Sequence, residues 1–293
     1  MTDSRCYVAT AGLVNALGSS REAVSEGLLE GDTSGMVLED GWLPGAPARV
    51  GRVISELPPL PRELAAYDCR NNRLLLLALA QIKNAVSAAL ERVGPARVAI
   101  VLGTSTSGIA EGEAAVAALV REGKLPPGFY YSQQEIGTAA LFLARYLGSS
   151  GPAYTVSTAC TSSAKALASA RSLLRAGLCD VAIAGGADSL CQLTVGGFTA
   201  LESTTADISN PMSRNRRGIN IGEGAALLLL TRDPAPVELL GVGESSDAHH
   251  ISAPEPGGRG AEAAMRAALA DAALLPEAVD YLNLHATATP KND

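Results

Sequence analysis

Short, almost uninterrupted apolar runs recur along this chain and restrict its fold more than any other feature. Continuous runs of this kind are typical of strands that are buried on both faces of a sheet. Between them lie Ala- and Leu-rich segments whose apolar residues have helical spacing. The alternation of strand and helix predicts an α/β protein. The predicted strands are residues 97–104, 153–159, 180–188, 224–231, 237–245 and 279–287.

The segments between these strands divide into helices and loops. Gly177 follows the third predicted helix in the position expected of a C-cap. Residues 39–51 and 55–64 are rich in Pro and Gly, and we expect irregular surface segments there. Residues 204–224 form a longer loop, and long ordered loops tend to carry function. The predicted helices cover residues 72–93, 110–122, 163–176 and 260–275.

The charge balance and the lengths of the apolar runs exclude several classes of function. A formal net charge of -7 and a pI near 5.1 argue against a nucleic-acid partner, because phosphate binding needs a basic face. The apolar runs are shorter than the roughly 20 residues of a membrane helix, so we expect no membrane association. The N-terminus has an acid before any base and makes a poor signal peptide. We therefore expect a cytoplasmic location.

Five cysteines at wide, irregular spacing, with no CxxC pair, predict neither a disulfide framework nor a zinc site. One of them, Cys160, lies between an apolar strand and the small residues that begin a helix. A thiol at a helix N-terminus is close to unpaired N–H groups and to the positive end of the helix dipole, which favour the thiolate. The alternative is a free cysteine used as a small buried hydrophobe, and position alone does not decide between the two.

Only three histidines, His249, His250 and His285, are available for His-dependent chemistry. His285 ends a predicted strand, where catalytic groups collect in α/β sheets. A lone histidine is more often a structural residue, but the hydroxyl groups of the following "ATAT" offer further polar contacts. A cysteine and a strand-end histidine together suggest acyl transfer through a thiolate. No GxGxxG or P-loop motif indicates a nucleotide, and we expect no metal.

Six motifs follow one another over nearly the whole chain: "GLVNALGSS", "VLGTSTSGIAEGE", "VSTACTSSAKALASARSLLRAGLCDVAIAGGADSL", "GFTALESTTADISNPMSRNRRGINIGEGAALLLL", "SSDAHHISAP" and "NLHATATPKND". In this order they resemble the β-ketoacyl-[acyl carrier protein] synthases, or ketosynthases, of the thiolase superfamily. The resemblance implies a thiolase-like α/β fold of layered sheets and helices. It divides the chain into an N-terminal half, residues 1–236, and the start of a C-terminal half, residues 237–293.

The resemblance implies roles for four residues. Cys160 would take up the acyl chain as a thioester, and His285 would be the first catalytic histidine. Thr287 and Thr289 would hold the pantetheine arm of the substrate. The implied reaction is a decarboxylating Claisen condensation, in which a malonyl thioester loses carbon dioxide and the resulting carbanion attacks the Cys160 thioester. Neutral histidines would stabilise the enolate by donating to the thioester oxygen.

The implied partner is an acyl carrier protein, whose phosphopantetheine carries the substrates, so no cofactor is expected in the chain itself. Relatives form homodimers or pair with a related subunit, so we expect association through an edge strand. Carrier proteins are acidic, and docking needs a local basic patch. The candidates are Arg62, Arg70 and Arg73, or the loop arginines Arg214, Arg216 and Arg217. For any single arginine, a solvated surface position is the alternative.

The chain departs from the family pattern in several respects. The family's second histidine, in a "GH" motif, and its "GFGG" segment have no counterpart here, so we expect the second half to be incomplete in this chain. His249 and His250 fall in a loop motif and do not easily replace it. The family's "HGT" is His285-Ala286-Thr287, a change that matters only if the backbone needs a positive φ. Two alternatives to condensation remain: a partner subunit without the full site, and an acyltransferase that uses Cys160 alone.

Overall fold

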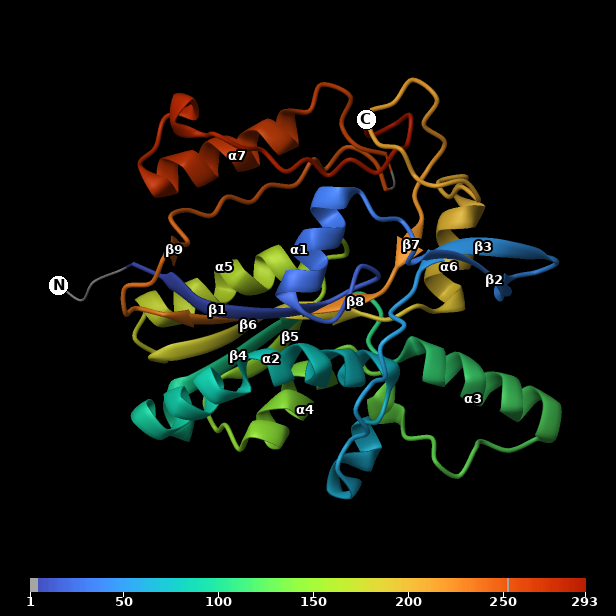
Figure 1. The fold of residues 1–293 in the computed structure, drawn as a ribbon, viewed down its shortest axis with the longest axis horizontal. Coiled ribbons are helices and arrows are strands. Elements are labelled where there is room, and N and C mark those ends of the chain that lie inside the picture. The colour runs from blue at the N-terminus through green and yellow to red at the C-terminus, as the bar shows by residue number, and fades with distance from the viewer. Residues whose placement is uncertain (1–4, 252) are drawn as a thin grey trace.

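The computed structural model describes residues 5–251 and 253–293 and is built on a six-stranded mixed sheet (Figure 1). β4 pairs in parallel with both β5 and β6, whereas β8 runs antiparallel to β6 and to β1. The predicted α/β class is confirmed. In spatial order the strands are β5 (Ala153–Val156), β4 (Val98–Gly103), β6 (Val181–Asp188), β8 (Gly224–Thr231), β1 (Tyr7–Val14) and β9 (Val237–Glu238).

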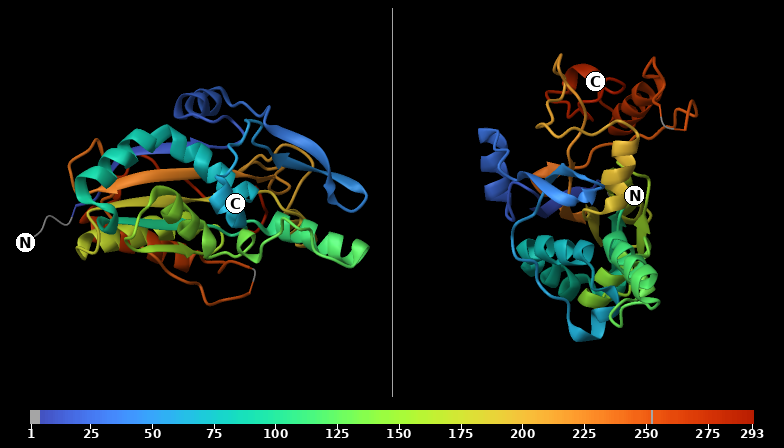
Figure 2. Two further views of the ribbon diagram at one scale, coloured as in Figure 1. Left: turned by 90° about the horizontal axis from the view of Figure 1, so that it is seen from below. Right: turned by 90° about the vertical axis from the view of Figure 1, so that its right-hand side faces the viewer.

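Helices cover both faces of this sheet (Figures 1 and 2). The four predicted helices are confirmed to within three residues at each end, and Gly177 has the left-handed φ of 70° expected after a helix. Three further helices, α1, α4 and α6, were not predicted. The helices are α1 (Arg21–Glu30), α2 (Arg70–Val93), α3 (Ile109–Glu122), α4 (Thr138–Leu147), α5 (Ser162–Arg175), α6 (Gln192–Ala200) and α7 (Arg259–Ala272). Short 3-10 helices cover Arg62–Tyr67, Pro95–Arg97, Tyr131–Gln133 and Pro276–Ala278.

Side chains of the central strands alternate between the two faces and thereby define the layers. Ile100 and Leu102 of β4 pack in one apolar cluster with α2 and α4. Ala99 and Val101 point the other way, into a cluster with α5 and with Ala182 of β6. The face that receives α5 is therefore the one with the smaller side chains, so this helix lies close to the sheet.

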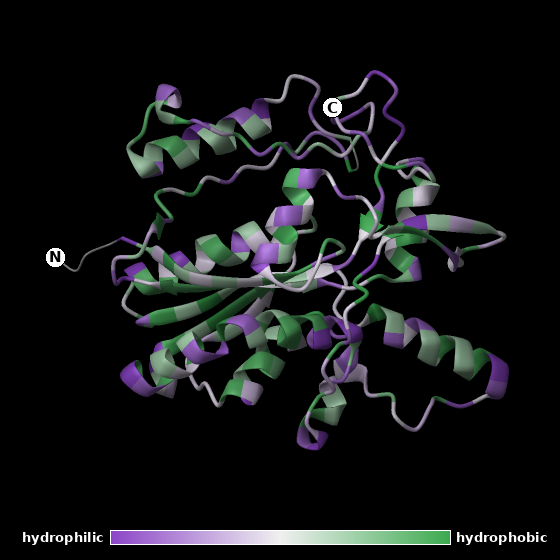
Figure 3. Ribbon diagram, in the orientation of Figure 1, coloured by the Kyte–Doolittle hydropathy of each residue, from purple (hydrophilic) through white to green (hydrophobic). Residues whose placement is uncertain are grey.

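α2 is long and apolar enough to cross a membrane by length and composition alone. Its Leu74, Leu75 and Leu79 are nevertheless buried in the core cluster beneath the sheet. Figure 3 shows apolar residues throughout the central strands and along this helix. The pattern is typical of the core helix of a globular domain.

The prediction of irregular structure for residues 39–51 was wrong, because most of them form an antiparallel hairpin. Pro44 and Gly45 make its two-residue turn, with Gly45 at a φ of 71°, so the residues that indicated a loop belong to a tight turn. Val50 of the hairpin packs with Val195 of α6. The strands are β2 (Met36–Leu43) and β3 (Ala46–Gly51), and β7 (Ile221–Gly222) extends the small sheet.

The predictions of strands at 237–245 and 279–287 were also wrong in most of their length. Only Val237–Glu238 pairs with β1, and the rest of both segments runs without a partner strand in the described parts of the chain. Their apolar content is that of buried strands, but a strand needs neighbours to satisfy its N–H and C=O groups. Beyond Leu239, whose N–H donates to the Cys6 carbonyl at 2.8 Å, the described residues supply no neighbouring strand for either segment. Both segments lie with α7 on the α5 side of the sheet (Figure 1).

Polar contacts hold this C-terminal part against α5. Arg171 of α5 is almost fully buried, and it binds the carboxylate of Asp271 on α7 and donates to the carbonyl of Leu240. Asp271 also accepts a hydrogen bond from the backbone N–H of Val242 at 2.9 Å. One carboxylate therefore ties together α5, α7 and the segment that follows β9.

Candidate active site

Cys160 lies in the turn between β5 and α5, as the sequence predicts. β5 ends at Val156, and α5 begins at Ser162. Within the turn Ala159 has a left-handed φ of 55°, which turns the chain sharply just before the thiol. Cys160 is exposed, so its sulfur is accessible to a substrate.

Two side chains fix this turn. The hydroxyl of Ser162 accepts from the Thr158 N–H at 2.9 Å and donates to the Ala159 carbonyl at 2.6 Å. The hydroxyl of Thr161 donates to the Thr158 carbonyl at 2.9 Å. These bonds span Cys160 on both sides and hold the backbone of the turn around it.

Two glycines let the amino end of α5 approach the sheet. A Cβ on Gly103 would lie 2.4 Å from the carbonyl carbon of Ser162, and one on Gly186 would lie 2.4 Å from the hydroxyl of Ser163. Such contacts are too close for a real side chain. The N-terminus of α5 therefore sits directly on the carboxyl ends of β4 and β6, where its unpaired N–H groups favour negative charge.

The other cysteines do not compete with Cys160. Cys6, Cys69, Cys179 and Cys191 are all buried. Burial raises the pKa of Cys69 to about 12, with the charge of Glu111 adding to the effect, and burial raises the pKa of Cys179 to about 11. Raised pKa values disfavour the thiolate at these buried positions, and Cys160 is the exposed cysteine among the described residues.

His285 lies in the unpaired segment after α7 and is exposed. No hydrogen bond joins it to the Cys160 turn anywhere in residues 5–251 and 253–293. The segment that carries His285 lies on the α5 side of the sheet, and α5 is the helix that follows the Cys160 turn (Figure 1). His249 and His250 lie in the exposed loop before α7, where the Nδ1 of His250 accepts from the Ala253 N–H.

The two predicted pantetheine-binding threonines are brought together. The hydroxyl oxygens of Thr287 and Thr289 are 2.9 Å apart. Between them Ala288 is fully buried, and its carbonyl accepts from the Gly218 N–H at 2.8 Å. The carboxylate of Asp293 accepts from the Ala288 N–H at 2.9 Å. The threonine pair is thus anchored to the long loop predicted at 204–224.

The backbone around this threonine pair has positive φ angles, the condition under which the change from glycine to Ala286 matters. Ala286 has a φ of 42° and Ala288 a φ of 57°, both in the left-handed region. An L-residue is strained there, whereas glycine is not. Ala286, which replaces the glycine of the family's "HGT", therefore occupies a position where glycine would be relaxed.

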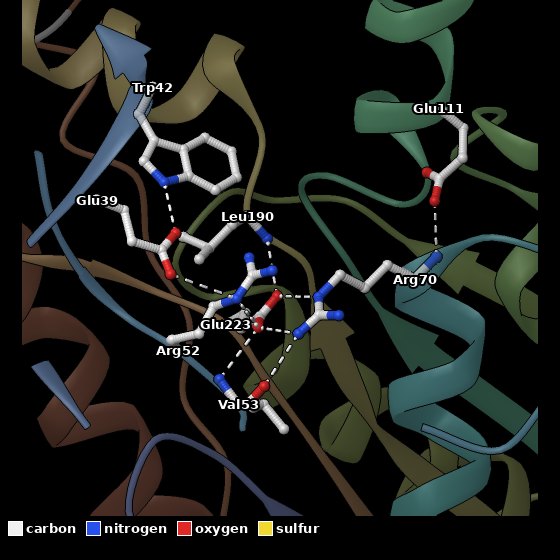
Figure 4. Close-up of polar contacts among 8 residues, drawn as sticks. All are labelled: Glu39, Trp42, Arg52, Val53, Arg70, Glu111, Leu190 and Glu223. Atoms are coloured by element: carbon white, nitrogen blue, oxygen red, sulfur yellow. Dashed lines mark hydrogen bonds and ion pairs between the residues drawn. The ribbon is translucent and has the colours of Figure 1, made fainter. Parts of the chain in front are cut away.

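The candidate docking arginines differ in their contacts. Arg70 forms a two-pronged ion pair with the fully buried carboxylate of Glu223, at 2.7 and 2.5 Å (Figure 4). Arg73 binds Asp68 in the same way, at 2.7 Å for both bonds. Arg62 is exposed in the first 3-10 helix. Arg70 therefore already has an internal structural partner.

Sequence reasoning missed Glu223, which lies at the centre of the cluster in Figure 4. It accepts from the Val53 N–H at 3.1 Å and the Leu190 N–H at 3.4 Å as well as from Arg70, and Arg52 lies 4.0 Å away. The cluster joins β2, the segment that follows β3, α2 and the segment before α6, and it borders a polar cavity of about 950 Å³. The only sequence signal for Glu223 was that it is the single acid in "GINIGEGAALLLL".

No group of three or more His, Cys, Asp or Glu side chains that could hold a metal ion occurs in the part of the chain that the structure describes.

Comparison with known proteins extends these observations. Residues 61–235 match the family model described as beta-ketoacyl synthase, N-terminal domain, and residues 237–293 match its C-terminal domain. Nodulation protein E of Rhizobium meliloti (strain 1021) is 31% identical, over 99% of this chain and 75% of its own length. The chloroplastic 3-oxoacyl-[acyl-carrier-protein] synthase I of Arabidopsis thaliana is 28% identical, over 99% of this chain and 66% of its own.

A solved structure is more similar still. It is the ketosynthase ApeO in complex with its chain length factor ApeC from Xenorhabdus doucetiae. It is 46% identical with a TM-score of 0.95, over 99% of this chain and 73% of that one. The close superposition confirms the predicted thiolase-like arrangement of layered sheets and helices.

Proposed function

Because this chain belongs to the β-ketoacyl synthase family, we propose that it elongates an acyl chain carried by an acyl carrier protein, with Cys160 as the nucleophile. One observation carries the proposal: the accessible cysteine of the described chain sits at the amino end of α5, in a turn held by Ser162 and Thr161. The exposed thiol also argues for a catalytic subunit over a partner that keeps only the fold.

The chemistry proceeds in two steps. The Cys160 thiolate attacks the carbonyl carbon of an acyl-pantetheine thioester, the pantetheine thiolate leaves, and the acyl group stays on the sulfur. A malonyl thioester then loses carbon dioxide, and its carbanion attacks the Cys160 thioester, forming the new carbon–carbon bond and releasing the Cys160 thiolate. His285 donates a hydrogen bond to the thioester oxygen as negative charge develops there.

Thr287 and Thr289 bind the pantetheine arm in this proposal, which their adjacent hydroxyls support. We place docking of the acidic carrier on exposed arginines, Arg62 or the loop residues Arg214 and Arg217, because Arg70 is engaged with Glu223. The chain acts in the cytoplasm, with no cofactor of its own, as a dimer with itself or with a related ketosynthase subunit. The complex of ApeO with a chain length factor supports the second arrangement.

The test is product analysis with malonyl-loaded carrier protein and an acyl thioester. We expect an acyl adduct on Cys160 by intact mass, release of carbon dioxide and a β-ketoacyl product, all lost in Cys160→Ala. Ser157→Ala, an exposed neighbour in the same turn, is the matched control. An adduct without carbon dioxide release would instead identify an acyltransferase, and an adduct that persists in Cys160→Ala would refute the assignment of the nucleophile.

A further inference from the structure

The loop that follows β4 donates several hydrogen bonds to a single carboxylate oxygen. Oδ1 of Asp188 accepts from the hydroxyls of Thr104 and Thr106 at 3.1 and 2.9 Å. It also accepts from the backbone N–H groups of Ser105 and Thr106 at 2.7 and 2.9 Å. Four donors from three consecutive residues therefore converge on this one oxygen at the end of β6.

A second layer of hydrogen bonds fixes the same loop. The hydroxyl of Thr104 accepts from the Ser107 N–H at 2.9 Å, and that of Thr106 accepts from the Ser189 N–H at 3.0 Å. The hydroxyl of Ser189 donates to the Ser107 carbonyl at 2.9 Å. Ser107 is fully buried with a left-handed φ of 45°. A serine persists in that strained conformation only when its surroundings hold it there.

This network adjoins the Cys160 turn. Asp188 lies two residues after Gly186 on β6, so both face the side of the sheet that receives α5. Gly186 is in contact with Ser163 in the first turn of α5, and Ser163 and Asp188 line the same hollow of about 290 Å³. The Thr104 N–H donates to the carbonyl of Val156, the last residue of β5 before the turn.

We propose that Asp188 is a positioning residue for acyl transfer at Cys160: it fixes the 104–107 loop, which in turn fixes the end of β5 and the nucleophile turn. The inference rests on the function proposed above. A thioester carbonyl must be held at a defined distance and angle from the sulfur, and a misplacement of about 1 Å costs on the order of 100-fold in rate. Asp188 acts through the loop and touches no reacting atom.

The test compares two reactions of the same thiol. Acylation by a hexanoyl thioester of a short pantetheine mimic requires a positioned substrate, whereas alkylation by iodoacetamide requires only an accessible thiolate. In Asp188→Ala we expect acylation to fall by roughly 10- to 100-fold while alkylation stays within about threefold. Asp188→Asn keeps an acceptor oxygen at the same place and should restore most of the acylation rate.

A folded Asp188→Ala chain that acylates at the wild-type rate, or in which acylation and alkylation fall by the same factor, would overturn the inference. If that variant does not fold, Thr106→Val removes one hydroxyl of the network and should still lower acylation selectively. Thr33→Val makes the same chemical change on an exposed residue and is the control. A wild-type chain that is not acylated at all would overturn the proposed function itself, and this inference with it.

Discussion

Substitution of Gly103 by alanine tests how closely the nucleophile depends on the packing of α5. The new Cβ would lie 2.4 Å from the Ser162 carbonyl carbon and 2.5 Å from both the Ser162 oxygen and the Ser163 nitrogen. All three are backbone atoms of the first turn of α5, so no side chain can rotate away. The backbone of Gly103 itself is not left-handed, and the conflict is therefore purely steric.

The size of the effect follows from these distances. Ordinary contacts of a Cβ are 3.4–4 Å, so the amino end of α5 has to move by about 1 Å. Overpacking of this kind costs about 1–3 kcal/mol of folding free energy. A shift of about 1 Å at the nucleophile lowers the acylation rate by on the order of 100-fold. We therefore expect a folded protein with a moderately lower melting temperature and a large loss of acylation.

The assay is the time course of the acyl adduct by intact mass, together with a thermal melt of the same sample. Gly128→Ala is the matched control, because Gly128 is exposed and a Cβ there meets no atom within 4 Å. The control should acylate like the wild type. A Gly103→Ala chain that does the same would show that the nucleophile tolerates displacement of α5, and the packing argument would fail.

Three further predictions concern stability. Glu223→Ala leaves Arg70 without its buried partner and should lower the free energy of unfolding in urea by about 3–5 kcal/mol; a loss below about 1 kcal/mol would contradict a structural role. Ala286→Gly relieves the left-handed backbone and should raise the free energy of unfolding by about 1 kcal/mol, whereas a decrease would refute strain there. The Val242 N–H and then Arg171 lower the pKa of Asp271 to about 2 from 3.8, so its contribution is present above about pH 4 and lost as the pH falls towards 2. The free energy of unfolding, measured with denaturant at several pH values between 4 and 2, should fall less steeply with decreasing pH for Asp271→Asn than for the wild type. Equal slopes for the two proteins would exclude the linkage.

The elements that the sequence predicted well are those with many neighbours. β4, β6 and β8 lie inside the sheet, where both faces are covered, so a continuous apolar run is a sufficient signal. The segment 279–287 has the same composition but no strand beside it in the described residues. Composition reports what a segment would bury, whereas strand structure also depends on what lies next to it.

The residues of the candidate site also differ in whether the sequence alone could predict them. Cys160 could be located because a lone cysteine between a strand and small helical residues has a local signature. Asp188 could not, because its role depends on donors more than eighty positions away in the chain, which only the parallel pairing of β4 and β6 brings near. The hairpin at 39–51 was missed for a different reason: Pro44 and Gly45 are typical of loops and of tight turns alike.

The place of β5 has a consequence for regulation. In the described chain this strand pairs only with β4, so its outer edge is open, and it leads through one residue into the turn that Thr158 and Ser162 hold around the thiol. A partner that pairs with that edge and moves β5 would therefore move the turn that carries the thiol. If such a partner changes the equilibrium constant for acylation of Cys160, linkage requires that acylation change the affinity for the partner by the same factor.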